Sequence, residues 1–190
     1  MKSDEIRREA IAQLLKDQLS AGKDVAFRVI GDSMEPVIRL GDQVFVRETS
    51  GWDLSPGDVI LYRNGSAYCT HRFVRRFIKD HTVFYLTKGD RFRDFDIPFT
   101  EDRILGKVVA TRRKDHRIDL ARSPLKNANR LLGRFLGLQS LIVKCLRTDL
   151  FRVRERTIFP FLRRILLMLV FRVNRMVTAF LVCRNADSTK

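Results

Sequence analysis

Residues 58–77 read DVILYRNGSAYCTHRFVRRF and hold the clearest structural signal in the chain. Two runs rich in apolar and aromatic residues, 58–62 and 67–77, flank the dipeptide Asn64-Gly65. An Asn-Gly pair between two such runs is a strong hairpin signal, because both residues accept the positive φ that a two-residue hairpin turn requires. The stretch therefore predicts two antiparallel strands joined by a tight turn.

Further strand-like runs lie on both sides of this hairpin. They are residues 25–30, 43–47, 82–87 and 104–111. The first of them alternates with the two-residue period of a strand, and turn sequences such as Gly41-Asp42 and Gly89-Asp90 separate the others. Many short strands with Gly-rich turns predict a mostly β fold, closed into a barrel or sandwich.

Helical patterns flank the β region. Before it, apolar residues recur at helical spacing over residues 3–21, and Gly22 is suited to end that helix. After it, residues 125–147 and 150–183 are rich in Leu, Ile, Phe and Arg, and we predict that they are helical. The chain is therefore expected to consist of an amphipathic helix at 1–21, a β domain at 22–120 and a basic, apolar helical region at 121–190.

The 190-residue chain has a formal net charge of +15, and this charge is unevenly distributed. Residues 1–110 hold 18 basic and 17 acidic residues, whereas residues 111–190 hold 19 basic and 5 acidic residues. A nearly neutral front and a strongly basic rear indicate two functions in one chain. With 45% hydrophobic and 31% charged residues, the composition is typical of a globular protein and argues against a disordered one.

The basic rear indicates contact with an anionic surface or a partner rather than a membrane span. Its longest uncharged apolar run is 165–171, far short of the about 20 residues that a span needs. Each central Arg also opposes insertion by about 2.5 kcal/mol or more. Helices lying in the interface of an anionic membrane fit this composition, and packing on the β domain or on a partner chain is the alternative. Large aliphatic residues interleave with the Arg residues, which disfavours nucleic acid as the partner.

Neither a secretion signal nor a metal site is indicated. The first 20 residues contain several acidic side chains and no apolar core of signal-peptide length, so we expect a cytoplasmic or peripheral membrane protein. The three cysteines and three histidines show no metal-ligand spacing and no disulfide framework. We accordingly expect no metal and no cofactor.

Three polar clusters can carry chemistry. Ser33 follows the first strand in a Gly-Asp-Ser turn, His71 lies in a strand-like run, and the acidic residues Asp90 and Asp96 follow another strand. Each cluster also has an ordinary structural explanation, since Ser and Asp are common in turns. A serine needs a neighbouring base to act as a nucleophile, an imidazole can take its proton, and a carboxylate can orient the imidazole. These residues converge only if the sheet brings their strands together.

Several short motifs follow one another in this part of the chain. They are Ser33-Met34 with Pro36, Gly41-Asp42 with Val44, then 56–60, His71-Arg72, 87–90, Asp96 and 105–108. In this order, over residues 27–109, they resemble the type I signal peptidase superfamily, which also includes the self-cleaving repressors of the SOS type. The usual bacterial members have a lysine base where this chain has His71. The chain is therefore similar to the endoplasmic-reticulum and archaeal version of the superfamily.

The resemblance implies a role for each polar residue. Ser33 would be the nucleophile, His71 the general base and Asp96 the acid that orients the imidazole, with Asp90 as the alternative acid. Lys88 is an alternative base, although in the resemblance it belongs to the turn.

The resemblance also implies how the surroundings of the nucleophile act. The backbone N–H of Ser33 is expected to stabilise the oxyanion, whereas Gly31 offers no side-chain donor where some relatives have a hydroxyl. Met34 and Pro36 are candidate substrate-binding residues, and core packing is the alternative role for Met34.

Together these features predict a serine endopeptidase of the signal-peptidase type that cleaves a protein or peptide substrate near a membrane surface. The mechanism would pass through an acyl-enzyme. One alternative is a regulator on the same fold that cleaves itself, with Ala21-Gly22 as the candidate bond, or that holds a partner. A binding module without activity is the other alternative, and the joint presence of Ser, His and Asp argues against it.

Overall fold

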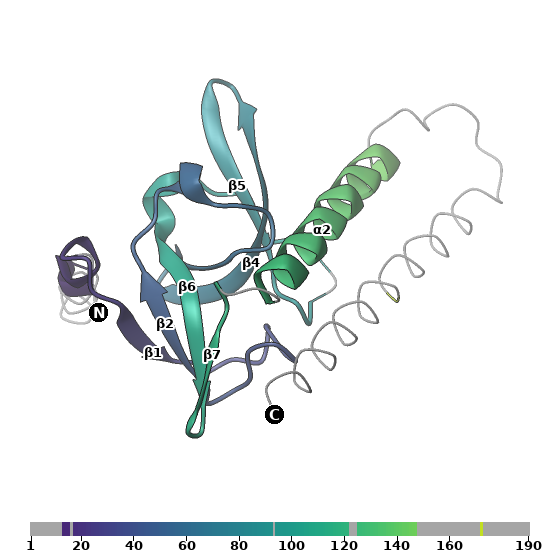
Figure 1. Ribbon diagram of the computed structural model, residues 1–190. Coiled ribbons are helices and arrows are strands. Elements are labelled where there is room, and N and C mark those ends of the chain that lie inside the picture. The colour runs from purple at the N-terminus through teal and green to yellow at the C-terminus, as the bar shows by residue number, and fades with distance from the viewer. Residues whose placement is uncertain (1–12, 16, 93, 122–124, 148–171, 173–190) are drawn as a thin grey trace, which may run out of the picture.

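A computed structural model describes residues 13–15, 17–92, 94–121, 125–147 and 172. The fold is an antiparallel β-sheet with helix α2 (Leu125–Arg147) packed beside it (Figure 1). The strands are β1 (Val25–Arg28), β2 (Gln43–Arg47), β3 (Val59–Asn64), β4 (Ala67–Lys79), β5 (Thr82–Lys88), β6 (Ile104–Arg113) and β7 (His116–Asp119). Two short 3-10 helices, η1 (Gly51–Asp53) and η2 (Glu101–Arg103), lie between strands.

The predicted hairpin and the mostly β fold are confirmed. β3 and β4 pair antiparallel with Asn64 opposite Ala67. The two turn residues are therefore Gly65, whose φ is 60°, and Ser66, one position later than the Asn-Gly pair predicted. The other predicted strands appear within a few residues of their expected bounds. β7 was not expected, because its four residues, His-Arg-Ile-Asp, contain a single apolar side chain.

The sheet does not close, so the expected closed barrel is wrong. Its strand order is β1-β2-β6-β3-β4-β5, with β7 also paired to β6, and within the described residues β1 and β5 remain separate edges. The irregular segment before η2 occupies the outer edge of β5. Tyr85 and Phe99 exchange both backbone hydrogen bonds, at 2.8 and 3.1 Å. Because those backbone groups are already satisfied, a closing strand has no place there.

The main hydrophobic core lies on one face of the sheet. Alternate residues of β2, Val44 and Val46, are buried in it. Leu19, from the N-terminal helical residues 17–20, is buried in the same cluster. The described helical residues 13–15 and 17–20 fall within the helix predicted at 3–21, whose first part lies outside the described residues.

Helix α2 packs against β4. Leu132 and Leu136 are buried with Val74 of that strand. The helix predicted at 125–147 is confirmed, whereas the one predicted at 150–183 falls almost entirely outside the described residues. Within the part of the chain that the structure describes, no helix has the length and apolar character needed to cross a bilayer.

The backbone of α2 approaches the turn before β3 very closely. A Cβ atom added to Gly133 would lie 2.0 Å from the amide nitrogen of Gly57. A Cβ atom added to Gly57, whose φ is 101°, would lie 1.9 Å from the carbonyl oxygen of Asn129. Both positions therefore require glycine, and the contact fixes the first half of α2 on the sheet.

We expect Gly133→Ala to lower the free energy of unfolding by about 1–3 kcal/mol, because the added methyl group pushes α2 away from a rigid backbone turn. Urea unfolding measures this change. Gly137→Ala is the matched control, since the nearest atom to its added Cβ, the carbonyl oxygen of Val74, is 4.0 Å away. The control should gain up to about 1 kcal/mol from helix propensity. Equal changes in the two variants would contradict the close approach.

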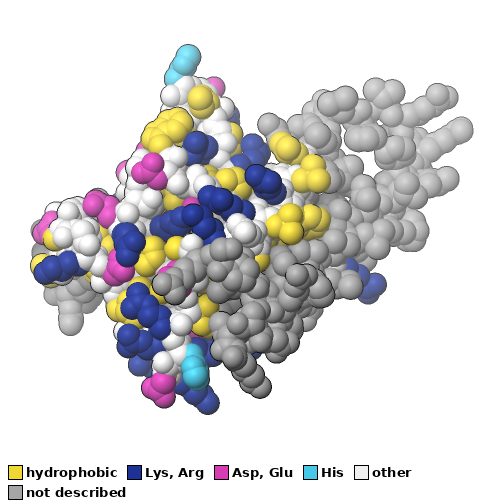
Figure 2. Space-filling model, in the orientation of Figure 1, with side chains coloured by type: hydrophobic (Ala, Val, Ile, Leu, Met, Phe, Trp, Pro, Cys, Tyr) yellow, Lys and Arg dark blue, Asp and Glu magenta, His cyan; other side chains and the backbone are white. Residues whose placement is uncertain are grey.

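Basic side chains line one exposed row of the sheet. The register places Gln43 between Arg28 and Arg112, and Arg112 lies opposite Arg117 of β7. The guanidinium groups of Arg112 and Arg117 stand over the ring of Phe45, at 5.0 and 4.4 Å from its centroid. Figure 2 shows Lys and Arg side chains at several places on the visible face, with fewer Asp and Glu. The basic character of the chain thus extends onto the described sheet.

Candidate active site

Ser33 lies in the turn that follows β1. Residues 33–37 form this turn, and the buried side chain of Met34 anchors it in the core. The carbonyl oxygen of Ser33 accepts a hydrogen bond from the backbone N–H of Arg91 at 2.9 Å. The core therefore fixes the loop that carries Ser33 on one side, and the turn after β5 fixes it on another. Pro36 is half-buried, and the substrate-binding roles of Met34 and Pro36 stay predictions.

His71 projects from the middle of β4 and is almost completely buried, with 6% of its surface exposed. Its Nε2 atom lies 3.0 Å from Ser33 Oγ, and its Nδ1 atom lies 2.7 Å from Asp96 Oδ2. The hydroxyl of Tyr62, on the neighbouring strand β3, lies 3.3 Å from the same Nδ1. One imidazole thus joins a serine hydroxyl to a carboxylate.

Backbone pairing along the edge of β5 positions Asp96. Its backbone N–H donates to the carbonyl oxygen of Thr87 at 3.0 Å, and the Thr87 hydroxyl donates to Asp96 Oδ2 at 2.6 Å. Burial opposes ionisation of the Asp96 carboxyl, but the hydrogen bonds from His71 and Thr87 outweigh it and hold its pKa below the ordinary 3.8. Asp96 is therefore a carboxylate at neutral pH.

This arrangement is suited to general-base chemistry. A carboxylate at Nδ1 favours the tautomer of His71 with its proton on Nδ1, which leaves the Nε2 lone pair facing the Ser33 hydroxyl. A distance of 3.0 Å is within reach for transfer of the hydroxyl proton to Nε2. Burial raises the pKa of the Tyr62 phenol, so this group stays a neutral hydroxyl beside the imidazole.

Asp90, the alternative acid, has a different partner. Arg72 donates to its two carboxylate oxygens from Nε at 2.8 Å and from Nη2 at 2.6 Å. Both side chains of this ion pair are buried. The structure thus brings Ser33, His71 and Asp96 together and leaves Asp90 with Arg72.

Lys88, the alternative base, is fully buried beside the site. Its Nζ atom reaches the carbonyl oxygen of Gly89 at 3.5 Å, whereas the side chain that bonds Ser33 Oγ in the described structure is His71. Burial lowers the pKa of the Lys88 ammonium group, against the attraction of Asp90. The geometry favours His71 over Lys88 as the base.

Sequence reasoning assigned no role in the site to several residues near the imidazole. The ring edge of Phe92 meets the His71 ring at an interplanar angle of 87°, with centroids 5.8 Å apart. Arg91 forms ion pairs with Asp32, beside Ser33, and with Glu35. The Thr87 hydroxyl was missed too, although its place two residues before the Gly-Asp turn was a usable signal. Among the described residues, no group of His, Cys, Asp and Glu side chains is arranged to hold a metal ion.

A family model described as Peptidase S24-like matches residues 2–109, which is more than half of the chain. The chain belongs to the Peptidase S24-like family. Comparisons with curated proteins and with solved structures gave no match.

The S24-like match contains the whole hydrogen-bonded set described above. It spans β1 to β5 and most of β6, and it includes Ser33, His71 and Asp96. β7 and α2 lie beyond it. The resemblance drawn from the order of the motifs is thus confirmed at the level of the S24-like serine peptidase superfamily.

We expect the contribution of Asp96 to the free energy of unfolding to be lost in acid. Because its folded-state pKa is lowered, this contribution is fully present above the ordinary value of 3.8 and is lost as the pH falls below it. The free energy of unfolding, measured by urea titration from neutral pH to about pH 3, should fall more steeply in the wild type than in Asp96→Asn. Asp115→Asn, in the exposed β6–β7 turn, should keep the wild-type profile. Parallel profiles for wild type and Asp96→Asn would contradict the expectation.

Proposed function

We propose that this protein is a serine endopeptidase of the signal-peptidase type, in the histidine-containing version, with Ser33, His71 and Asp96 as its catalytic residues. The observation that carries the proposal is the single imidazole that hydrogen-bonds Ser33 Oγ at 3.0 Å and Asp96 Oδ2 at 2.7 Å. Such a set is recognised by geometry and roles and not by its order in the chain. Membership of the S24-like family supports a serine-peptidase fold around it.

The proposed reaction is acyl transfer to Ser33. Its Oγ attacks the peptide carbonyl carbon while His71 Nε2 takes the hydroxyl proton, and the carbonyl electrons move to the oxygen, where the Ser33 backbone N–H is the expected donor. The C–N bond then breaks as Nε2 returns the proton to the leaving amine. Water hydrolyses the ester by the same proton route. Asp96 stabilises the imidazolium without taking its proton.

The proposed substrate is a protein or peptide held near an anionic membrane surface. The basic, apolar composition of residues 150–183 supports this part of the proposal. A second support is the surface beside the site. Ile30, three residues before Ser33, is 90% exposed, and Ile97, next to Asp96, is 88% exposed. Apolar side chains on the surface are suited to contact an apolar peptide or a bilayer.

A quenched peptide with a signal-peptide-like sequence tests the proposal, with vesicles of anionic or neutral phospholipid present. We expect cleavage that requires Ser33 and His71. Its rate should increase with the anionic vesicles and not with the neutral ones. Intact-mass analysis should also detect an acyl adduct on the wild type and none on Ser33→Ala. Cleavage that persists in Ser33→Ala would overturn the assignment of the nucleophile. A cleavage rate that is the same without vesicles and with either kind of vesicle would overturn the proposed role of the membrane surface.

A self-cleaving regulator is the second candidate, because the S24-like match at 2–109 includes Ala21-Gly22. In the folded chain this dipeptide ends the N-terminal helix, and the Ala21 N–H donates to the carbonyl oxygen of Asp17 at 3.1 Å. Self-cleavage would need to release it from that helix end. Fragmentation of the wild type at this bond, with Ser33→Ala intact, would favour the regulator. An intact wild type that cleaves added peptide would favour the endopeptidase.

A further inference from the structure

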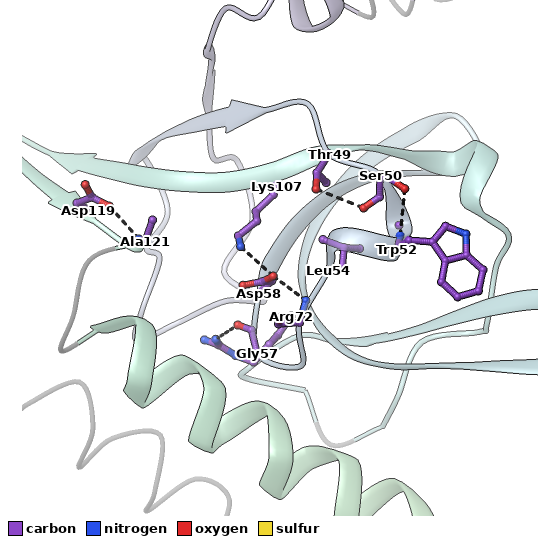
Figure 3. Close-up of polar contacts among 12 residues, drawn as sticks. Thr49, Ser50, Trp52, Leu54, Gly57, Asp58, Arg72, Lys107, Asp119 and Ala121 are labelled. Carbon is purple, nitrogen blue, oxygen red and sulfur yellow. Dashed lines mark hydrogen bonds and ion pairs between the residues drawn. The ribbon is translucent and has the colours of Figure 1, made fainter.

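Helix α2 contributes a side chain to the buried ion pair beside His71. Arg72 binds Asp90 through Nε and Nη2, and its remaining Nη1 donates to the carbonyl oxygen of Gly57 at 2.7 Å and to Asn129 Oδ1 at 2.8 Å. Figure 3 shows the Arg72 guanidinium directed at the Gly57 carbonyl, beside the helix. Asn129 therefore accepts one of the four hydrogen bonds that this fully buried cation donates, and it does so from outside the family match.

The partner of that cation, Asp90, belongs to the turn that lies against the His71 ring and the backbone carbonyl of Ser33. A Cβ atom added to Gly89 would lie 3.2 Å from His71 Nε2 and 2.9 Å from the carbonyl oxygen of Ser33. The backbone N–H of Arg91 donates to that same carbonyl oxygen at 2.9 Å. Holding Asp90 in place thus holds the backbone on both sides of it, against Ser33 and His71.

We propose that Asn129 is a positioning residue and that α2 is part of the catalytic unit. An unsatisfied N–H on a buried guanidinium is unfavourable, so loss of the Asn129 acceptor should make Arg72 rotate toward another partner. Asp90 and its turn would follow, and the distance between Ser33 Oγ and His71 Nε2 would change. The close contact of α2 with Gly57 keeps Asn129 within reach of Arg72. The kinetic readout of this inference rests on the proposed endopeptidase activity.

A comparable contact on the same helix and strand provides the matched control. Arg75 of β4 donates from Nε to Ser140 Oγ of α2 at 3.0 Å. Like the Asn129 contact, it joins an arginine of β4 to a polar side chain of α2. Arg75, however, pairs with Leu86 of β5, which precedes the turn at 89–91 that contacts Ser33. Ser140→Ala therefore removes a contact between helix and sheet without disturbing the ion pair of Arg72.

Steady-state kinetics with the quenched peptide test the proposal. We expect Asn129→Leu to lower kcat by about tenfold to a hundredfold with little change in KM, because misplaced reacting groups slow the chemical step. Asn129→Asp keeps an acceptor oxygen for Arg72 and should retain most of the wild-type kcat. Ser140→Ala should leave kcat unchanged. A wild-type kcat in Asn129→Leu, or equal losses in the control variants, would overturn the proposal.

Nuclear magnetic resonance provides a second readout that needs no turnover. The backbone amide signals of Gly89 and Arg91 and the ring signals of His71, in a chain with three histidines, should move in Asn129→Leu and stay in place in Ser140→Ala. If the wild type cleaves no peptide but these signals move, the proposed function fails and the positioning role stands. If the signals stay in place in Asn129→Leu, the positioning role fails whatever the kinetics.

Discussion

Replacing Ser33 or His71 by alanine is expected to slow peptide cleavage by about 10⁵-fold or more, because residues that act as one catalytic unit lose nearly all of its effect together. A hydrogen bond of 3.0 Å joins Ser33 Oγ to His71 Nε2, so loss of either residue should remove the proposed proton transfer between them. The measurement is kcat/KM with the quenched peptide. The double variant should be no slower than either single one, and additive losses would mean that the two residues act independently.

Asp96→Asn is expected to have a smaller effect, of about 10⁴-fold. The asparagine keeps the size of the side chain, but its amide can donate to His71 Nδ1. The imidazole would then carry its proton on Nε2, where it meets the Ser33 hydroxyl and cannot accept its proton. An Asp96→Asn enzyme with wild-type kcat would mean that the carboxylate does not set the tautomer.

Lys88→Met separates the two candidate bases. The Lys88 ammonium group is fully buried and its pKa is lowered by burial, so replacement by an apolar side chain of similar length should be tolerated. We expect turnover within a few-fold of the wild type, measured beside His71→Ala. Loss of activity in Lys88→Met together with activity in His71→Ala would assign the base to the lysine.

The parts of the fold that could be read from the sequence are those that local patterns determine. The Asn64-Gly65 hairpin and helix α2 follow from turn chemistry and from helical spacing, and both were predicted within a few residues. The open form of the sheet depends on a long-range contact, because the pairing of Phe99 with Tyr85 occupies the edge of β5. No periodicity marks that pairing, because Phe99 stands in a segment without regular structure.

The same limit applies to the site. The order of the motifs predicted Ser33 and His71, and the structure joins them. Asp90 stayed open as the alternative to Asp96, because no local pattern marks it as the partner of the buried Arg72. Asp96 reaches the imidazole because its backbone hydrogen-bonds Thr87 at the edge of β5. The contribution of α2 was invisible as well, since Asn129 is one polar residue on an otherwise ordinary amphipathic helix.

The Arg72–Asp90 pair is expected to produce the largest stability effect in the chain. Its side chains are 0% and 1% exposed, and two hydrogen bonds join them. Asp90→Asn leaves a buried guanidinium without a counter-charge, so the free energy of unfolding should fall by about 3–5 kcal/mol in urea titrations. Arg72→Met should cause a loss of similar size, and the double variant should lose less than the sum of the two.

Lys88 should affect the free energy of unfolding of Asp90→Asn in a direction that can be tested. Burial lowers the pKa of its ammonium group, the Asp90 carboxylate opposes that change and Arg72 reinforces it. In Asp90→Asn the attraction of the Asp90 carboxylate is lost and only Asp96 and Asp94 still attract the lysine, so the repulsion between Lys88 and Arg72 is less compensated. Asp90→Asn/Lys88→Met should therefore be more stable than Asp90→Asn alone. A less stable double variant would mean that the lysine contributes packing or hydrogen bonds that outweigh its repulsion of Arg72.

An exposed pair of the same geometry separates the effect of burial from that of hydrogen bonding. Arg47 donates to the two carboxylate oxygens of Asp24 at 2.8 and 3.0 Å, but its side chain is 59% exposed. Asp24→Asn should therefore lower the free energy of unfolding by less than about 1 kcal/mol. A similar, small loss in Asp90→Asn would mean that water or Lys88 adjusts to the buried Arg72. The turn beside Ser33 would then be held by its backbone hydrogen bonds, and the positioning role of Asn129 would lose its physical basis.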